Sequence, residues 1–239
     1  LRRPIFGTLG RVYPKLNKWP RYLRAKATFQ SLAMDPLDGY MDSVSVVKEP
    51  IRRRMFSKSF NSSLQGYRAV EVLRGHAADG PDHPLLQAQY LDFKTYLPGD
   101  ILTKVDRASM AHSLEVRVPV LDHPLVEWAA GLAPDLKLHR GEGKYLLKHA
   151  LRNDLPHDIL YRRKMGFAVP LNAWFRGPLR ERVRETLLGP EVLDTGLFDA
   201  DALRHMLDQH NARQWDHSAP IWSLLMFAGF QQQFGGVST

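Results

Sequence analysis

Apolar residues recur at intervals of three and four along most of this 239-residue chain, which is the spacing of a helix that buries one face. The clearest segments are residues 36–44, 84–97, 200–211 and 219–233. β-Branched residues cluster only at 44–47 and 116–120, and Pro119 interrupts the second cluster. The pattern therefore predicts a mainly α fold, in a chain long enough for one large domain or two small ones.

Local residues predict where some of these helices begin and end. Asp35 precedes Pro36, so we expect Asp35 to cap a helix whose first turn contains the proline. Pro98 and Gly99 should break the long apolar helix that precedes them. Asp100 could then cap the next helix.

Composition excludes several kinds of site. The chain contains no cysteine, so it has no disulfide, no thiolate metal ligand and no cysteine nucleophile. Its histidines lack the spacing of a metal site: His205 and His210 are five residues apart, and His210 and His217 seven, so no metal ligand is predicted. No apolar run approaches the roughly 20 residues that span a membrane, and no signal peptide is predicted from the first residues. A cytoplasmic location is expected, since a reducing compartment suits such a chain.

The net charge of +8 comes entirely from the first part of the chain. Residues 1–34 hold eight basic residues and no acidic one, and a helix is predicted over 21–33. Such a basic arm can bind nucleic acid, which would make the chain a non-enzymatic helical interaction module. A solvated basic surface, or one packed against acidic protein, is the simpler interpretation, and nucleic acid is not the favoured partner.

Two charged clusters carry most of the chemical information. In residues 100–122, charges interrupt an otherwise apolar run, and Asp100 and Arg107 share one helical face. Glu115 and Arg117 alternate in an extended exit from that helix, so they point to one side. These charges could hold a carboxylate or phosphate, or they could form a structural ion network at a helix crossing.

The second cluster is the run Arg162-Arg163-Lys164, which is followed by Gly166. Adjacent cations repel one another unless anions oppose them, and a glycine permits close approach to the backbone, so the run suits a polyphosphate. An exposed basic loop is the alternative. The nearby Gly141-Glu-Gly-Lys144 lacks the spacing of a phosphate loop and is expected to form a turn at a helix start.

Three stretches, in order, resemble the C-terminal synthetase domain of the glutamine-hydrolysing asparagine synthetase family. They are Leu102-Thr-Lys-Val-Asp-Arg-Ala-Ser-Met-Ala-His-Ser-Leu-Glu-Val-Arg-Val-Pro-Val-Leu-Asp122, Gly143-Lys-Tyr-Leu-Leu-Lys148 and Tyr161-Arg-Arg-Lys-Met-Gly-Phe167. The similarity is closest to the amidotransferases of this type found beside bacterial exosortase and exopolysaccharide genes. It implies that residues 1–239 form the helical second half of an adenine nucleotide alpha hydrolase-like synthetase domain. Residues 1–34 would be a basic arm with the first helices, and residues 84–175 the core that bears the motifs.

The resemblance also implies a reaction. A glutaminase domain releases ammonia, and the synthetase domain uses Mg-ATP to adenylate aspartate or a similar carboxylate, giving pyrophosphate. Ammonia then forms the amide and releases AMP. The glutaminase cysteine and the pyrophosphate loop Ser-Gly-Gly-x-Asp-Ser are absent from this sequence. The chain is therefore interpreted as a fragment, inactive alone, that leaves most ATP and Mg²⁺ contacts to residues outside it. A homodimer is left open.

Residue roles follow from the same resemblance. Lys164 matches the family lysine that contacts the phosphates, so it is predicted to be both catalytic and nucleotide-binding. Asp100 and Asp106 are the other catalytic candidates, through contact with the substrate amine or ammonia. Arg163 and Arg107 are predicted to bind the nucleotide. The predicted structural supports of the site are Glu115, Arg117, Asp122 and Lys144.

Overall fold

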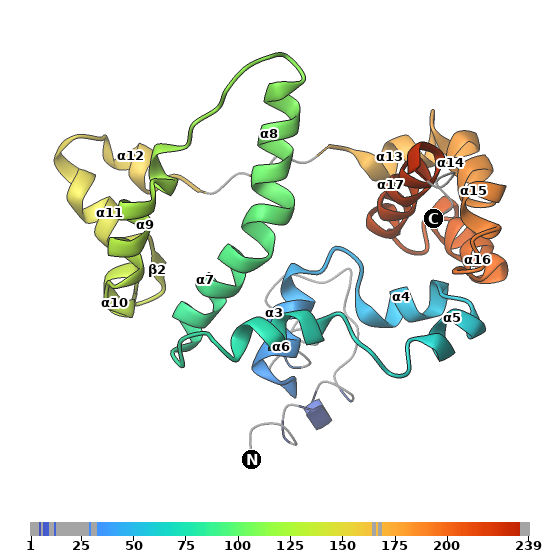
Figure 1. The fold of residues 1–239 in the computed structure, drawn as a ribbon, viewed down its shortest axis with the longest axis horizontal. Helices are drawn as coiled ribbons and strands as arrows, with labels where there is room; N and C mark the ends of the chain where they lie inside the picture. Colours follow the sequence, from blue (N-terminus) through green and yellow to red (C-terminus); the bar gives the residue numbers. More distant parts are fainter. Residues whose placement is uncertain are drawn as a thin grey trace. The chain divides into compact units, whose positions relative to one another are not determined.

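The computed structural model describes residues 5, 7–9, 12, 29, 33–163, 166 and 169–234. The described chain is mostly helical, which confirms the predicted fold class, and it divides into two compact units (Figure 1). The first unit joins the residues before Val72 to those from Ala168 onward, and the second unit comprises Val72–Phe167. The charged residues of the predicted basic arm, and nearly all of the helix predicted over 21–33, lie outside the described residues.

The first unit is built from helices at both ends of the sequence. They are α3 (Pro36–Val44), α4 (Glu49–Met55), α5 (Lys58–Ser63), α13 (Leu171–Arg176), α14 (Arg180–Leu187), α15 (Pro190–Leu193), α16 (Ala200–Asn211) and α17 (Ser218–Phe234). Helix α6 (Val70–Ala77) begins in this unit and continues into the second. The predicted cap at Asp35 is confirmed, because its carboxylate accepts a hydrogen bond from the Leu37 N–H at 3.1 Å.

A buried apolar cluster holds the first unit together. Its members come from α4 and from all five C-terminal helices, and α17 contacts α13, α14 and α15. The buried residues are Met55, Phe175, Val183, Leu187, Val192, Leu203, Met206, Leu207, Ile221, Leu224 and Ala228. Backbone hydrogen bonds from Ser57 to Leu197 and from Asp199 to Met55, both 2.8 Å, fasten the N-terminal helices to the C-terminal ones. This unit therefore has a core of its own.

The second unit is a succession of short elements. They are α7 (Pro84–Lys94), a π-helical turn (Leu97–Leu102), α8 (Thr103–Met110), a 3-10 turn (Pro119–Leu121), α9 (His123–Ala130), α10 (Pro134–Lys137), β1 (Leu138–His139), β2 (Glu142–Gly143), α11 (Tyr145–Ala150), a 3-10 turn (Leu151–Asn153) and α12 (His157–Leu160). Strands β1 and β2 pair antiparallel around Arg140 and Gly141, which both have positive φ. The turn predicted here is thus a two-residue hairpin that leads into α11.

The structure corrects the prediction for Asp100. Pro98 and Gly99 end α7 only in part, because helical winding continues through the π-helical turn into α8. A wider turn accommodates a proline ring that would clash with the carbonyl of a regular helix. Asp100 lies inside this turn, and α8 begins at Thr103 without a side-chain cap, so the prediction that Asp100 caps the helix was wrong.

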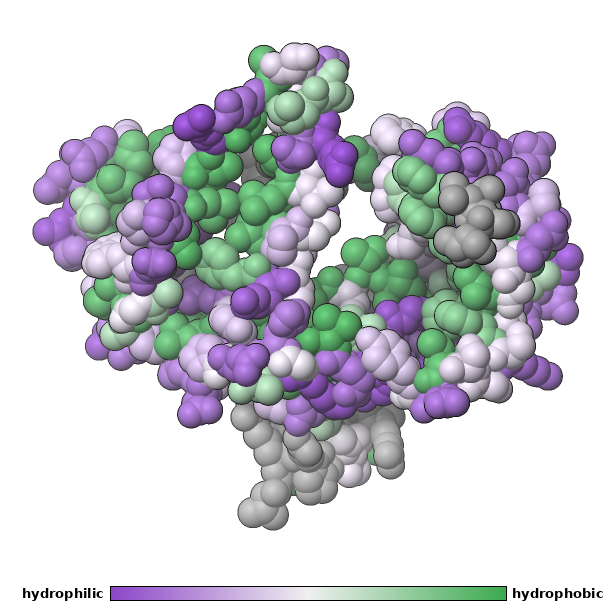
Figure 2. All heavy atoms as spheres, in the orientation of Figure 1, coloured by the Kyte–Doolittle hydropathy of each residue, from purple (hydrophilic) through white to green (hydrophobic). Residues whose placement is uncertain are grey.

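Little of the second unit is buried. Among its described residues only Leu73 and Leu91 fall in the buried class, whereas many large apolar side chains are exposed. Figure 2 shows hydrophobic residues gathered on the surface between α8 and α9. Exposed apolar surface on this scale is typical of a face that packs against further protein. None of the helices in the described part of the chain combines the length and apolar character needed to cross a membrane.

Candidate functional site

The first predicted cluster lies on the surface of the second unit. Asp100 is in the π-helical turn, Asp106 and Arg107 are on α8, and Glu115 and Arg117 are on the extended segment that follows. All five are exposed in the described structure. The alternative interpretation, a buried ion network at a helix crossing, is therefore not what the structure shows.

Asp100 has a partner that sequence reasoning missed. Its negative charge raises the pKa of the Tyr96 hydroxyl, and slight desolvation, a hydrogen bond between the two side chains and the charge of Asp92 add to this rise. Tyr96 precedes Asp100 by four residues, the spacing at which side chains meet along a helix, so this spacing could have indicated the pair.

Asp106 and Arg107 differ from Asp100 in their side-chain contacts. Neither side chain makes a hydrogen bond or ion pair with another residue in the part of the chain that the structure describes. An exposed aspartate and an exposed arginine next to each other on one short helix present both signs of charge outward. They remain available to a ligand or to a protein surface.

Glu115 and Arg117 point to the same side of the extended segment, as their alternation predicts. The Arg117 Nε donates to the Glu115 Oε1 at 2.7 Å, although both side chains are largely exposed. The alternating positions of the segment carry the exposed apolar side chains of Leu114, Val116 and Val118, and the exposed Val120 follows in the 3-10 turn. The segment therefore has one charged face and one apolar face. The exposure of the apolar face indicates a surface that further protein covers.

The second predicted cluster gathers around α11. Lys148 donates to the Glu142 Oε1 at 3.1 Å, and its ammonium lies 4.8 Å from the centre of the Tyr161 ring. This contact holds the start of the cationic run beside α11. Arg162 and Arg163 are exposed, and so is Lys144, which adopts a left-handed conformation just before α11. Lys164, the residue singled out most strongly by the sequence, lies outside the described residues.

The two clusters are not joined directly in the described structure. No hydrogen bond or ion pair between described side chains connects the stretch from Asp100 to Arg117 with Lys144 or Arg163. Asp122 stands at the start of α9 without a side-chain cap and is exposed. Across the described residues, no group of three or more histidine and carboxylate side chains is placed to hold a metal ion.

The first unit contains a cavity, away from the predicted site residues. Its volume is about 370 Å³, and its lining contains no residue that the sequence predicts for the site. The charged side chains around it largely pair with one another. Arg68 donates to Asp38 at 2.5 Å, and both Arg52 and Arg53 pair with Glu49. The two pairs with Glu49 lie within α4 at spacings of three and four residues, and partly exposed pairs of this kind are ordinary surface ion pairs.

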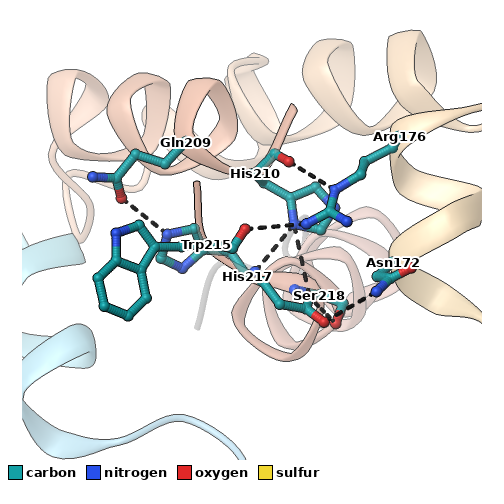
Figure 3. Close-up of polar contacts among 8 residues, drawn as sticks. Asn172, Arg176, Gln209, His210, Trp215, His217 and Ser218 are labelled. Carbon is teal, nitrogen blue, oxygen red and sulfur yellow. Dashed lines mark hydrogen bonds and ion pairs between the residues drawn. The ribbon is translucent and has the colours of Figure 1, made fainter. Parts of the chain in front are cut away.

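A polar network lies where α13, α16 and α17 meet (Figure 3). The Arg176 Nε donates to the His210 carbonyl at 2.7 Å, and its Nη2 donates to the Trp215 carbonyl at 3.2 Å. The buried His210 ring accepts the His217 N–H on Nδ1 at 3.0 Å, so its neutral form carries the proton on Nε2. The His217 ring contacts the Gln209 amide oxygen at 3.0 Å.

Asp216 completes the network. Its carboxylate accepts hydrogen bonds from the Ser218 hydroxyl at 2.6 Å, the Ser218 N–H at 3.0 Å and the Asn172 amide at 3.2 Å. Burial alone would raise the pKa of Asp216, but these bonds outweigh it and bring the pKa down to about 2. These bonds close the turn between α16 and α17, so we interpret the network as structural.

The network makes the first unit sensitive to acid. Burial and the Arg176 guanidinium lower the pKa of His210 despite the opposing charge of Asp216, and burial also lowers the pKa of His217, next to Asp216 and His205. As the pH falls, these histidines therefore take up protons in the unfolded chain before they do so in the folded chain. The free energy of unfolding decreases as the pH drops below about 6.5, the ordinary pKa of histidine. Asp216 adds a second loss between its ordinary pKa of 3.8 and about 2. Urea unfolding should therefore show a lower free energy of unfolding at pH 5.0 than at pH 7.5.

The variant His210→Asn keeps an acceptor for the His217 N–H but removes the titrating ring, so it should flatten this pH dependence. The exposed His112 lies in the second unit, and His112→Asn should leave the dependence intact. Equal slopes for the two variants would contradict the role given to His210.

Comparison with known proteins identifies the family of the chain. Residues 5–232 match the family model for asparagine synthase. Asparagine synthetase [glutamine-hydrolyzing] 1 of Bacillus subtilis is 31% identical over 209 residues, which cover 87% of this chain and 32% of that protein. Asparagine synthetase [glutamine-hydrolyzing] 3 of the same organism is 42% identical over 88 residues, 37% of this chain and 14% of the relative. Amidase chry2 of Gibberella zeae is 26% identical over 191 residues, 75% of this chain and 28% of the amidase.

The chain thus spans about a third of the length of the first of these relatives. No solved structure matches it. The match over residues 5–232 covers nearly the whole chain, so the chain belongs to the asparagine synthase family.

Proposed function

We propose that the chain forms the helical part of an ATP-dependent amidotransferase. The complete enzyme would activate a carboxylate, aspartate or a similar acid, as an acyl-adenylate with release of pyrophosphate. Ammonia from glutamine would then displace AMP and form the amide. The observation that carries this proposal is the family match across residues 5–232, together with the name of the Bacillus subtilis relative.

Within such an enzyme the second unit would supply one wall of the synthetase site. Two features support this proposal: its predicted site residues Asp100, Asp106, Arg107 and Arg163 are exposed, and its apolar surface is exposed as well. The glutaminase and pyrophosphate-loop parts would then cover the apolar surface and bring a nucleotide to the charges. Burial beneath this covering protein would lower the local dielectric and strengthen each charge interaction.

Each predicted residue then has a role suited to its chemistry. Lys164, with Arg163 and Arg107, would balance the charge that develops on the departing pyrophosphate. Asp100, next to Tyr96, and Asp106 would contact the substrate amine or the incoming ammonia. The Glu115–Arg117 pair would keep the extended segment in place, with Asp122 and Lys144 supporting the neighbouring helix starts.

Magnesium bound with the nucleotide would neutralise charge on the phosphates. The described residues offer no carboxylate cluster for it, so its ligands would belong to other parts of the enzyme. The cations of the second unit suit the phosphates themselves.

The 239-residue chain by itself should not bind Mg-ATP, because one wall of a site supplies too few contacts. Isothermal titration is expected to show no saturation up to about 1 mM nucleotide, the range where binding free energies are near 4 kcal/mol. A complete enzyme titrated in parallel should saturate. Tight, saturable binding by the chain alone would contradict the proposal that it lacks most of the nucleotide contacts.

A further inference from the structure

Lys148 on α11 differs from the cations around it in its burial. Its side chain is only 21% exposed, whereas Lys144, Arg162 and Arg163 are exposed. The Lys148 ammonium donates to the Glu142 Oε1 at 3.1 Å. An ammonium that is partly buried and already held by a carboxylate is poorly placed to reach out to a phosphate. The contacts of Lys148 therefore point to a role within the second unit.

Tyr161 receives the Lys148 ammonium on its ring. The Lys148 Nζ lies 4.8 Å from the centre of the Tyr161 ring, a favourable cation–π distance. The His157 ring, at the start of α12, stacks on Tyr161 with 4.5 Å between the ring centres. Tyr161 directly precedes Arg162 and Arg163 in the chain. These two contacts therefore hold the residue from which the cationic run starts.

The hairpin and α11 hold Lys148 in its turn. Glu142 lies opposite His139 in the antiparallel pair of strands, so the backbone that carries the carboxylate is fixed by the hairpin. The Lys148 N–H donates to the Lys144 carbonyl at 3.0 Å in the first turn of α11. The Lys148 ammonium thus joins the hairpin and α11 to Tyr161 and to the end of α12.

We propose that Lys148 is a positioning residue, which holds Tyr161 and thereby places Arg163 for contact with the nucleotide phosphates. This inference rests on the proposed function, which gives Arg163 its phosphate ligand. Adjacent cations repel one another, and ordering a long arginine side chain costs conformational entropy. A phosphate binds more tightly when the backbone before the arginine is already in place. Lys148 supplies this preorganisation without touching the nucleotide.

Carboxylate-dependent ATP–pyrophosphate exchange by the complete enzyme tests the proposal. Lys148→Met keeps much of the side-chain length but removes the charge, and it should raise the KM for ATP about tenfold. Lys148→Arg keeps a cation over the ring and should restore most of this loss. If Lys148 only supported folding, Lys148→Met would leave fewer active molecules, so the apparent kcat would fall while the KM stayed unchanged.

The matched control is Lys94→Met. Lys94 lies on α7 in the same unit, and its Nζ is 5.5 Å from the centre of the Tyr90 ring, so the variant removes a similar contact away from the cationic run. Its KM for ATP should equal that of the unchanged enzyme. An equal rise of the KM in Lys94→Met and Lys148→Met would overturn the proposal.

Double variants show whether Lys148 acts through Tyr161 and Arg163. Tyr161→Phe keeps the ring and should behave like the unchanged enzyme, whereas Tyr161→Leu should raise the KM as Lys148→Met does. Adding Lys148→Met to Tyr161→Leu or to Arg163→Ala should cause little further loss. Fully additive losses would mean that Lys148 contacts the nucleotide itself, and they would overturn the positioning role.

The same assay separates this inference from the proposed function. Exchange that depends on the carboxylate but is unchanged in Lys148→Met would overturn only the role of Lys148. An unchanged enzyme without any carboxylate-dependent exchange would contradict the proposed function, and the role of Lys148 with it.

Discussion

Replacing Lys164 by alanine is expected to lower amide synthesis by a complete enzyme roughly a hundredfold or more, a loss typical of removing a group that stabilises transition-state charge. Glutamine hydrolysis should stay close to its original rate, because the proposed enzyme would carry it out in another domain. The readouts are pyrophosphate and amide formed from ATP and the carboxylate, compared with glutamate released from glutamine.

The neighbouring Arg162→Ala provides the matched control. Arg162 has the same sign of charge, lies in the same cationic run and is exposed, but only Arg163 and Lys164 of this run are individually predicted to bind the nucleotide. Arg162→Ala should lower the rate of amide synthesis far less than Lys164→Ala does. If the two variants lose the same activity, or if Lys164→Ala lowers glutamine hydrolysis equally, the role given to Lys164 is wrong.

Phe175→Ala should destabilise the first unit by about 3–5 kcal/mol, because it removes a large buried ring from the cluster that joins its helices. Urea unfolding of the chain, followed by tryptophan fluorescence, measures the loss. The same truncation in the second unit, at the exposed Trp128, should cost less than about 1 kcal/mol in the isolated chain. Similar losses at both positions would contradict the view that only the first unit carries its own core.

The fold could be predicted best where a long run of residues follows the helical pattern and a capping residue marks the start of the helix. Asp35 caps α3 as expected, and the two long helices near the end, α16 and α17, match their predicted ranges closely. The short helices α13, α14 and α15 were missed, because each has too few apolar positions for a pattern to emerge. Yet Phe175 and Val192 on two of them are buried in the core, and only tertiary contacts determine that.

The candidate site could be predicted by motif rather than by geometry. The extended segment and its Glu115–Arg117 pair follow from alternation, which requires no tertiary information. The capping role of Asp100 was wrong because Pro98 widens the helix instead of ending it. The structural role of His210 could not be read from a lone histidine, since it depends on burial beneath α13 and on the turn that brings the His217 N–H to its ring.

The step that defines the proposed enzyme is the adenylation of a carboxylate. ATP–pyrophosphate exchange by the complete enzyme, without glutamine or ammonia, measures that step alone. Labelled pyrophosphate should enter ATP only when the carboxylate substrate is present, and Lys164→Ala should abolish the exchange. Formation of amide with ADP and phosphate as products, without any carboxylate-dependent exchange, would contradict adenylation of the carboxylate.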